Sequence, residues 1–317
     1  MRWWLTMGDL QSDDGCIVEL TWARSGLSAT EVLRYRAPAD RRVWGKGFTG
    51  GEFGRDGFFV PDFNSVYKID ATGRIDLLFT RPDFNDLHHI AWNAESLWVT
   101  NTGLDRIDVF TADGCFLGGK ALAPSVEEYE RRGQPGQIGS YFREDASLPF
   151  HRRRVQDGVH PNHVGVWQGV PVVTTLLDRT LRRLDDFTTV VTTPGHPHDG
   201  IEYDGLFWIT CTDGRVFAYE HAYGSIHVRH RLDLFASTGQ VGWCRGLWVG
   251  ATMLLVGLTR MAFAPNTNWP ARPFEQTRTA VLAVDRENGS LLDVLDLAAY
   301  GAHPKLFSIV RVPEWFR

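Results

Sequence analysis

Short apolar runs alternate with tight polar turns along most of the chain. The runs are about four to six residues long and rich in Val, Ile, Trp and Phe, and the turns contain Asp-Gly, Asn-Gly or another glycine. No extended pattern with the helical period of about 3.6 residues occurs. Runs of this length and composition are typical of β-strands. The pattern therefore predicts an all-β fold.

Six of these runs share one feature, because each ends in a tight polar turn. They span residues 16–20, 66–70, 106–110, 181–185, 215–219 and 280–284. Repetition at this spacing is typical of a β-propeller. If each unit holds an inner strand, a middle strand and one such turn-ended strand, five complete blades lie at about residues 48–84, 86–122, 160–195, 196–238 and 242–298.

The sixth blade has to combine the two ends of the chain. Residues 306–312 resemble an inner strand with nothing after it, whereas residues 3–37 supply three strands with no inner strand before them. Pairing these segments would remove the open edge of the ring. We therefore predict a six-bladed β-propeller closed between its termini. A five-bladed ring with a separate N-terminal hairpin is the alternative.

We predict a single domain over residues 1–317, with two insertions that do not fit the repeat. The first covers about residues 121–159 and includes a short predicted helix over 125–132, and the second covers about 261–279. Long insertions in a compact domain tend to form lids or binding loops, although solvated decoration is an equal interpretation.

Composition and charge narrow the class of protein. Of the 317 residues 43% are hydrophobic, which is enough for a large core, and the net charge of -5 comes from mixed signs. Neither nucleic acid nor an anionic membrane is therefore an expected partner. The four cysteines lie far apart, which predicts reduced thiols. The N-terminal residues lack an apolar run long enough for a signal peptide or a membrane span, so we expect a cytoplasmic protein.

Aligning the inner strands locates candidate functional residues. The segments His160-Pro-Asn-His163 and His196-Pro-His-Asp199 share their first two residues, which puts His163 and Asp199 in one column. Extending this alignment through the middle strands adds His89 and Arg245. In the first blade Glu52 has the nearest equivalent place, and His303 precedes the last inner strand. Each blade would then contribute one side chain to the same end of the central channel.

These residue types suit a metal site with catalytic neighbours. The predicted metal ligands are Glu52, His89, His163 and Asp199. Imidazoles with carboxylates favour Zn²⁺, Fe²⁺ or Mn²⁺ and leave coordination positions for water or substrate. Arg245 would grip a carboxylate or an oxyanion of the substrate, and His303 or His198 would exchange protons. The plainer interpretation is a wet channel whose polar side chains bond to backbone groups.

The residues directly before the ring positions form a second set of candidates. They are His88, Asn162 and His198. They could hydrogen-bond the metal ligands and so orient them, or they could line the pocket for the substrate.

Two short segments resemble a known enzyme family. The segment from Asp199 to Thr210 resembles the signature of the senescence marker protein/gluconolactonase (regucalcin) group, and Gly51-Glu52-Phe53-Gly54 is similar to that group's first inner strand. The resemblance implies that Glu52 and Asp199 bind a divalent metal, which polarises a sugar lactone and activates water. The group's asparagine ligand is replaced by His163, and imidazole in place of oxygen favours Zn²⁺ or Fe²⁺ over Ca²⁺.

A second resemblance follows more of the chain. Residues 97–102, 160–162, 197–200 and 245–259 resemble a bacterial propeller family that is known as a domain of unknown function. This resemblance implies a fold but no activity.

The leading hypothesis is a metal-dependent enzyme that acts on a small polar or anionic molecule at the channel mouth. Hydrolysis of a lactone or ester is the first candidate reaction, and isomerase, lyase or Fe(II)-dependent oxidase chemistry would use the same ring. A non-catalytic propeller that binds a protein or ligand is the rival, because the fold alone establishes no chemistry. A metal-free enzyme with Glu52 or Asp199 as its base is a third hypothesis.

Overall fold

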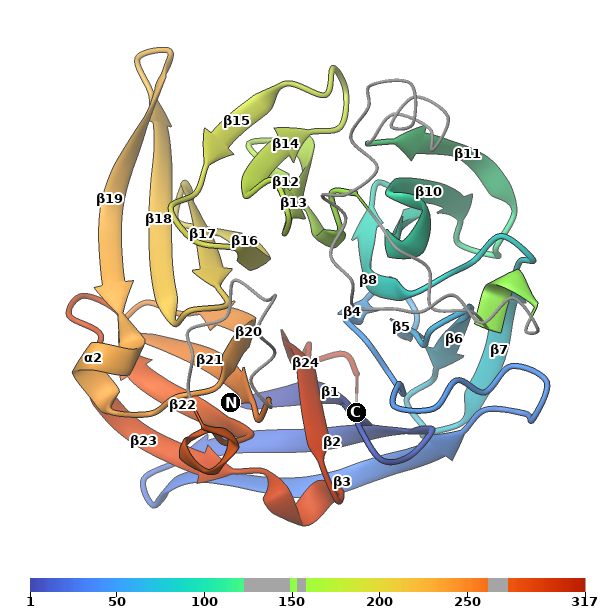
Figure 1. Ribbon diagram of the computed structural model, residues 1–317, viewed down its shortest axis with the longest axis horizontal. Coiled ribbons are helices and arrows are strands. Elements are labelled where there is room, and N and C mark those ends of the chain that lie inside the picture. Colours follow the sequence, from blue (N-terminus) through green and yellow to red (C-terminus); the bar gives the residue numbers. More distant parts are fainter. Residues whose placement is uncertain (123–148, 153–157, 262–272, 317) are drawn as a thin grey trace.

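A computed structural model describes residues 1–122, 149–152, 158–261 and 273–316. The helix expected over residues 125–132 and most of the second insertion lie outside these residues. The described part is built almost entirely of antiparallel strands, which form six four-stranded sheets arranged around a centre (Figure 1).

The six sheets are the blades, numbered here along the chain by their inner strands. Blade one contains β4 (Glu52–Phe53), β5 (Phe58–Pro61), β6 (Ser65–Ile69) and β7 (Ile75–Thr80). Blade two contains β8 (Leu87–Asn93), β9 (Ser96–Asn101), β10 (Arg106–Thr111) and β11 (Phe116–Ala121). Blade three contains β12 (Pro161–Trp167), β13 (Val170–Thr175), β14 (Thr180–Arg183) and β15 (Thr189–Thr192).

The remaining blades follow the same order from the channel outward. Blade four contains β16 (Pro197–Tyr203), β17 (Leu206–Cys211), β18 (Arg215–Ala222) and β19 (Ser225–Asp233). Blade five contains β20 (Trp243–Val249), β21 (Met253–Thr259), β22 (Ala280–Asp285) and β23 (Leu291–Asp296). Blade six contains β24 (Pro304–Arg311), β1 (Arg2–Asp9), β2 (Asp14–Ala23) and β3 (Gly26–Arg36).

Short helical turns join some of these strands. They are η1 (Thr102–Leu104), η2 (Phe150–Arg152), α2 (Leu234–Thr238), η3 (Phe274–Gln276) and η4 (Ala298–Tyr300). Among the described residues, no helix has the length and apolar character needed to cross a membrane.

The closure of the ring between the two chain ends is confirmed. β24 pairs antiparallel with β1, and Thr6 lies opposite Ser308 in this pair. The predicted six-bladed ring is therefore correct, and the five-bladed alternative is wrong. Because β1 pairs with β24 on one side and with β2 on the other, the first strand of the chain lies inside its sheet and has no open edge.

Burial explains why the middle strands appear as continuous apolar runs. All seven residues of β21 are buried, whereas the outermost strand of the same blade, β23, has exposed positions. A strand covered by neighbouring sheets on both faces needs apolar residues at every position, rather than at alternate ones. The blade boundaries could be predicted from the sequence for this reason.

The core consists of separate layers between blades. Six hydrophobic clusters form in the described residues, and each joins side chains of two neighbouring blades. In the layer between blades five and six, Trp3 packs edge-on against Trp248 with ring centroids 4.9 Å apart. The four cysteines are all free thiols, as predicted.

We expect Trp3→Ala to lower the free energy of unfolding by about 3–5 kcal/mol, because Trp3 is fully buried and its loss leaves a cavity at the closure of the ring. Trp44→Ala is the control, since Trp44 is 66% exposed and its replacement should cost far less. Equilibrium unfolding in guanidinium chloride measures both. Equal losses for the two variants would contradict this view of the core.

Candidate functional site

A backbone irregularity in the inner strands aims side chains into the channel. β8, β12, β16, β20 and β24 each contain a register shift near their start. In β16, for example, His198 and Asp199 together lie opposite Thr210 of the middle strand. Such a bulge bends the strand and changes the direction of its side chains, as is common near active sites. Each of these blades therefore offers two consecutive residues to the channel.

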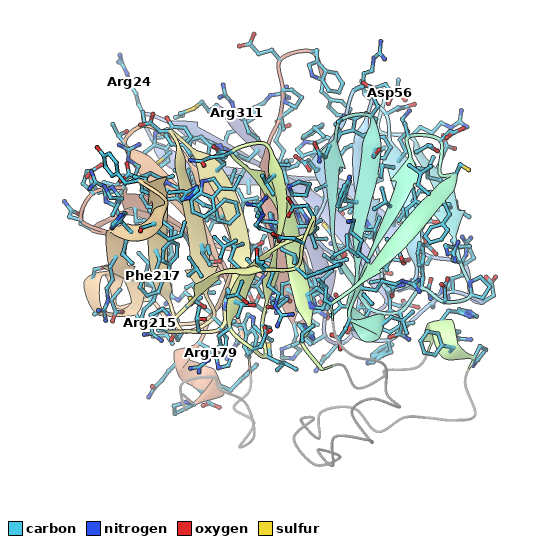
Figure 2. The ribbon with its side chains drawn as sticks, turned by 90° about the horizontal axis from the view of Figure 1, so that it is seen from above. Arg24, Asp56, Arg179, Arg215, Phe217 and Arg311 are labelled. Atoms are coloured by element: carbon cyan, nitrogen blue, oxygen red, sulfur yellow. The ribbon has the colours of Figure 1, made fainter. Side chains whose placement is uncertain are left out.

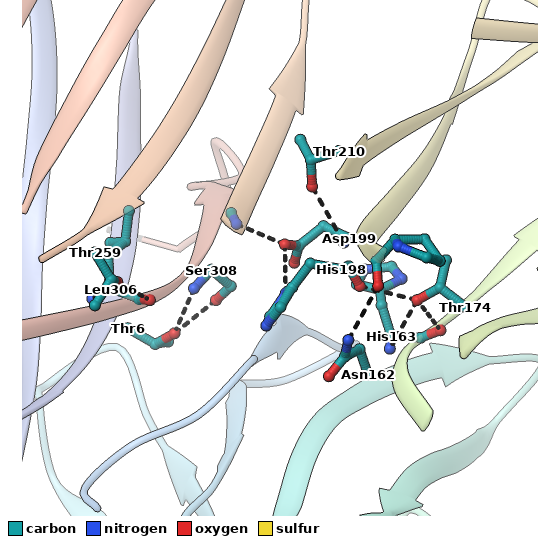
Figure 3. Close-up of polar contacts among 12 residues, drawn as sticks. Thr6, Asn162, His163, Thr174, His198, Asp199, Thr210, Thr259, Leu306 and Ser308 are labelled. Atoms are coloured by element: carbon teal, nitrogen blue, oxygen red, sulfur yellow. Dashed lines mark hydrogen bonds and ion pairs between the residues drawn. The ribbon is translucent and has the colours of Figure 1, made fainter. Parts of the chain in front are cut away.

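A hydroxyl group from the neighbouring strand fixes the bulge in four blades. The backbone N–H of the second bulge residue donates to the Oγ1 of a threonine in the adjacent strand, and Figure 3 shows several of these contacts. The pairs and their N···O distances are His89 and Thr100 (2.7 Å), His163 and Thr174 (3.2 Å), Asp199 and Thr210 (3.2 Å), and Ser308 and Thr6 (3.0 Å). His89, His163 and Asp199 thus occupy equivalent positions, as the sequence alignment predicts.

The predicted position of Arg245 is wrong by one residue. Leu247 pairs with Val256, and Arg245 pairs with Gly257, so Gly246 occupies the place of Asp199 and Arg245 occupies that of His198. The blade lacks the usual threonine, because a Cβ at position 257 would meet Leu306 at 1.9 Å and the Arg245 carbonyl oxygen at 2.3 Å. Without that threonine the sequence offers no marker for the alignment.

Glu52 lies beside the ring positions rather than in one of them. It pairs with Phe59, and its Oε2 accepts a hydrogen bond from the backbone N–H of Trp92 at 2.8 Å. Burial raises the pKa of Glu52 to about 7. The carboxyl group therefore holds the neighbouring blade and does not point freely at the channel axis.

His303 lies away from the other predicted residues. Its backbone N–H donates to Asp9 at 3.0 Å, and its ring lies 5.7 Å from the ring of Phe274. It lines a separate hollow of about 220 Å³ with Arg260 and Asp296. The structure therefore does not bring His303 into the ring of candidate residues.

The four predicted metal ligands line one cavity, which we call the distal cavity. It has a volume of about 480 Å³, and its walls include Glu52, His89, His163 and Asp199. Arg311, at the end of β24, also lines it, and Figure 2 shows Arg311 at the face opposite Arg179 and Arg215. The distal cavity therefore opens towards the face at which the inner strands end.

His89 and His163 form a pair of neutral imidazoles in the wall of this cavity. Their ring centroids lie 3.8 Å apart. Burial lowers the pKa of His163 to about 4 and lowers that of His89 well below its usual value, and His163 adds to the effect on His89. The Nδ1 atom of each ring is buried and has no hydrogen-bond partner among the described residues. Two neutral imidazoles in contact can therefore each offer a lone pair or a proton.

His198 and Asp199 form a buried hydrogen-bonded pair. Nδ1 of His198 donates to Oδ2 of Asp199 at 2.8 Å, and the backbone N–H of Gly246 donates to the same oxygen at 2.6 Å. Burial lowers the pKa of His198, although the carboxylate opposes this. Burial alone would raise the pKa of Asp199, but His198 and Gly246 hold it below its ordinary value. The pair is thus a neutral imidazole on an ionised carboxylate.

A second group of polar side chains surrounds the channel on the other side of these rings. We call it the proximal cluster, and it includes the apolar ring of Phe307 together with the polar residues Lys46, Asp86, His88, His160, Asn162, His198 and Arg245. The Lys46 ammonium donates to Asp86 at 2.6 Å, and His88 lies 4.7 Å from His160 and 6.2 Å from Phe307 between ring centroids. Because these residues come from different blades, they meet across the channel.

Arg245 is the most unusual member of the proximal cluster. Its side chain comes from blade five, yet Asp86 of blade two, on the opposite side of the ring, still raises the pKa of its guanidinium. Burial is the larger effect and lowers that pKa to about 10. The guanidinium is therefore poorly solvated, and its central carbon lies 4.7 Å from the ring centroid of Phe307 in blade six.

The predicted metal ligands do not form a complete coordination site. Within the described ranges, no group of three His, Cys, Asp or Glu side chains is arranged to hold a metal ion. The donor chemistry of His89 and His163 suits a transition metal, but Asp199 is bonded to His198 and Glu52 is bonded to Trp92.

Several members of the site escaped the sequence analysis. They are Ser308 and Gly246 among the ring positions, and Phe307, Lys46 and Asp86 in the proximal cluster. A threonine 11 positions after each of His89, His163 and Asp199 was a usable signal, because those hydroxyls mark the bulge. For Ser308 the partner is Thr6, which lies at the other end of the chain.

Comparisons with known proteins identify the fold. No family model matches the sequence, and no curated protein does. A protein of unknown function from Bacteroides caccae has a TM-score of 0.63 and 12% identity, with 99% of this chain and 100% of that chain covered. A chain of a nidogen/laminin complex has a TM-score of 0.60 and 13% identity, with 98% of each chain covered.

A third solved structure of similar fold has a name related to the gluconolactonase group that two segments of the sequence resemble. It is a protein from Bacteroides fragilis with a provisional 6-phosphogluconolactonase assignment, 14% identity and a TM-score of 0.48, with 92% of this chain and 82% of that chain covered. That score is too low to support an argument about activity. At the level of fold, the neighbours are consistent with both resemblances seen in the sequence. The strand order, the closure and these likenesses together make the chain a six-bladed β-propeller.

Proposed function

We propose that the protein is an enzyme that hydrolyses an ester or lactone bond of a small anionic molecule held in the channel. The observation that carries the proposal is the buried His198–Asp199 pair next to the buried guanidinium of Arg245. A base that is oriented by a carboxylate and lies beside a fixed cation is a common arrangement in acyl transfer.

The hydrogen bonds of the pair prepare His198 for this task. Because Nδ1 donates to Asp199, the lone pair of the ring is on Nε2. No hydrogen bond to a described residue uses Nε2. The N–H of Gly246 fixes the carboxylate from the next blade, so the ring direction is set by two blades. Nε2 is therefore available to a water molecule in the channel.

The proposed reaction balances without a further reactant. Nε2 of His198 takes a proton from water while the water oxygen bonds to the carbonyl carbon. The carbon–oxygen bond to the alcohol then breaks, and the imidazolium returns its proton to the leaving oxygen. Arg245 offsets the negative charge that develops on the carbonyl oxygen or that the substrate already carries.

His198→Gln should reduce hydrolysis by at least about a hundredfold, because it removes the base. The assay follows acid release from a panel of γ- and δ-lactones and from p-nitrophenyl acetate. His221→Gln is the matched control, since His221 is an exposed histidine near the end of β18 whose Nδ1 lies 3.2 Å from the side-chain oxygen of Gln168. We expect the control to keep the full rate.

Thermal unfolding of each variant checks that the fold is intact. If His198→Gln hydrolyses the panel as fast as the unaltered protein, or if no compound is hydrolysed, the enzyme proposal fails. In the second case, a non-catalytic binding role takes its place.

Divalent metal binding at His89 and His163 is a second candidate. It is favoured by the two buried Nδ1 atoms that have no partner in the described part of the chain. Neutral imidazoles are ligands for Zn²⁺, Fe²⁺ or Mn²⁺, and such a metal supplies polarisation of a carbonyl or a more acidic water. His89 and His163 would hold it, and Asp199 would have to exchange its contact with His198 to join them.

Metal binding can be measured without knowledge of the substrate. Elemental analysis should find close to one transition metal per chain. After removal of that metal with a chelator, adding Zn²⁺ at about a hundred times its Kd should stabilise the fold by about 2.7 kcal/mol. His163→Ala should abolish both effects, whereas His221→Ala should abolish neither. Absence of bound metal together with an unchanged melting temperature would rule out this candidate.

A further inference from the structure

Arg245 is a buried cation that contacts no carboxylate among the described residues. It is 7% exposed, and its Nε atom is buried with no hydrogen-bond partner. No hydrogen bond or ion pair joins its guanidinium to any described residue. The partly buried Arg106, by contrast, is paired with Asp83 and Asp108. A buried charge is costly unless it is paired, so an unpaired guanidinium in a channel indicates a place for an external anion.

Aromatic rings hold this guanidinium in place. Its central carbon lies over the ring of Phe307 at 4.7 Å and over that of Trp243 at 5.9 Å from the centroids. These cation–π contacts occupy the ring-facing side of the planar group and leave its in-plane N–H donors available. Donors in a fixed plane match the two oxygens of a carboxylate.

The charges around Arg245 favour an anion with a single negative charge. Asp199 and Asp86 both act electrostatically on Arg245 without touching it. Lys46, the neighbouring cation, is already paired with Asp86. Lys305, whose ammonium lies over the Phe307 ring at 5.2 Å, donates to the carbonyl oxygen of Gly45. The two nearby carboxylates repel a dianion such as phosphate more strongly than a monoanion.

We propose that the proximal cluster binds the carboxylate group of its substrate through Arg245, with Phe307 beneath the guanidinium. This inference rests on the proposed function in one respect only: that the bound molecule is a substrate and is hydrolysed. His198 and Arg245 occupy equivalent bulge positions in the neighbouring blades four and five, and Asp199 accepts from both His198 and the backbone N–H of Gly246, the residue after Arg245. The bond to be hydrolysed therefore lies within a few atoms of the carboxylate, and the substrate class is a small carboxylic acid that carries an ester or lactone.

Binding of simple anions tests the proposal directly. Benzoate, acetate and inorganic phosphate are titrated into the isotopically labelled full chain at constant ionic strength, and binding is followed by NMR. We expect saturable binding of benzoate and acetate, with phosphate at least about tenfold weaker. Arg245→Lys should weaken carboxylate binding by about tenfold or more, because lysine cannot form the two parallel bonds.

Control variants separate this proposal from the hydrolase proposal. Arg106→Lys changes an arginine that is already paired and should leave benzoate affinity unchanged. His198→Gln should abolish turnover yet keep benzoate affinity within about threefold, because it leaves the guanidinium in place. Benzoate binding that is weakened in Arg245→Lys but kept in His198→Gln supports the present inference even if hydrolysis is the wrong reaction.

Two results would overturn the inference. One is an Arg245→Lys variant that binds benzoate as tightly as the unaltered protein, and the other is phosphate binding that equals or exceeds carboxylate binding. If Arg245→Lys does not fold, Phe307→Leu replaces it as the test. That variant keeps the charge but removes the ring, and it should weaken benzoate binding by about two- to fivefold, since a cation–π contact contributes about 0.5–1 kcal/mol. Unchanged binding in Phe307→Leu would then count against the proposal.

Discussion

The site depends on hydrogen bonds between a threonine hydroxyl and the bulge of an inner strand. In blade two, Thr100 Oγ1 accepts from the backbone N–H of His89 at 2.7 Å and donates to the carbonyl oxygen of the same residue at 3.2 Å. The hydroxyl replaces the partner that these backbone groups would have in a regular strand. A regular strand would send alternate side chains into the two flanking blades. The bulge instead turns two consecutive side chains towards the channel.

This constraint explains how one ring can hold two different chemical environments. The second bulge residues, His89, His163 and Asp199, line the distal cavity, whereas the first bulge residues belong to the proximal cluster. The His198–Asp199 hydrogen bond connects the two environments within a single bulge. Gly246 adds a backbone donor from the next blade at 2.6 Å, so the carboxylate is held by groups of neighbouring blades. The preorganised part of the site is therefore the contact between blades four and five.

The fold could be predicted from the sequence because each blade repeats its apolar pattern. All blade positions and the pairing of β24 with β1 followed from those runs, since strands buried on both faces must be apolar throughout. The positions of His89, His163 and Asp199 could also be predicted, because the middle strands of their blades are similar in sequence. The prediction failed at Arg245, where Gly257 replaces the threonine and the close approach of Leu306 leaves no room for a side chain.

The remaining differences between prediction and structure arise at positions for which the repeat gives no alignment. A bulge adds one residue to a strand, and counting alternate positions cannot detect it unless a neighbouring residue marks it. His303 was selected because it precedes an inner strand, yet its loop turns towards Asp9 and Phe274. The Lys46–Asp86 pair could not be found, because it joins a residue before the first blade to one before the second, without any repeat to relate them.

A crystal structure of the protein soaked with benzoate tests the central assignment most directly. The arrangement of Arg245, Phe307 and His198 predicts a planar carboxylate bound edge-on to the guanidinium, on the side of the channel that faces Nε2 of His198. An Arg245 side chain paired with a carboxylate of the protein, with benzoate absent or bound elsewhere, would contradict it.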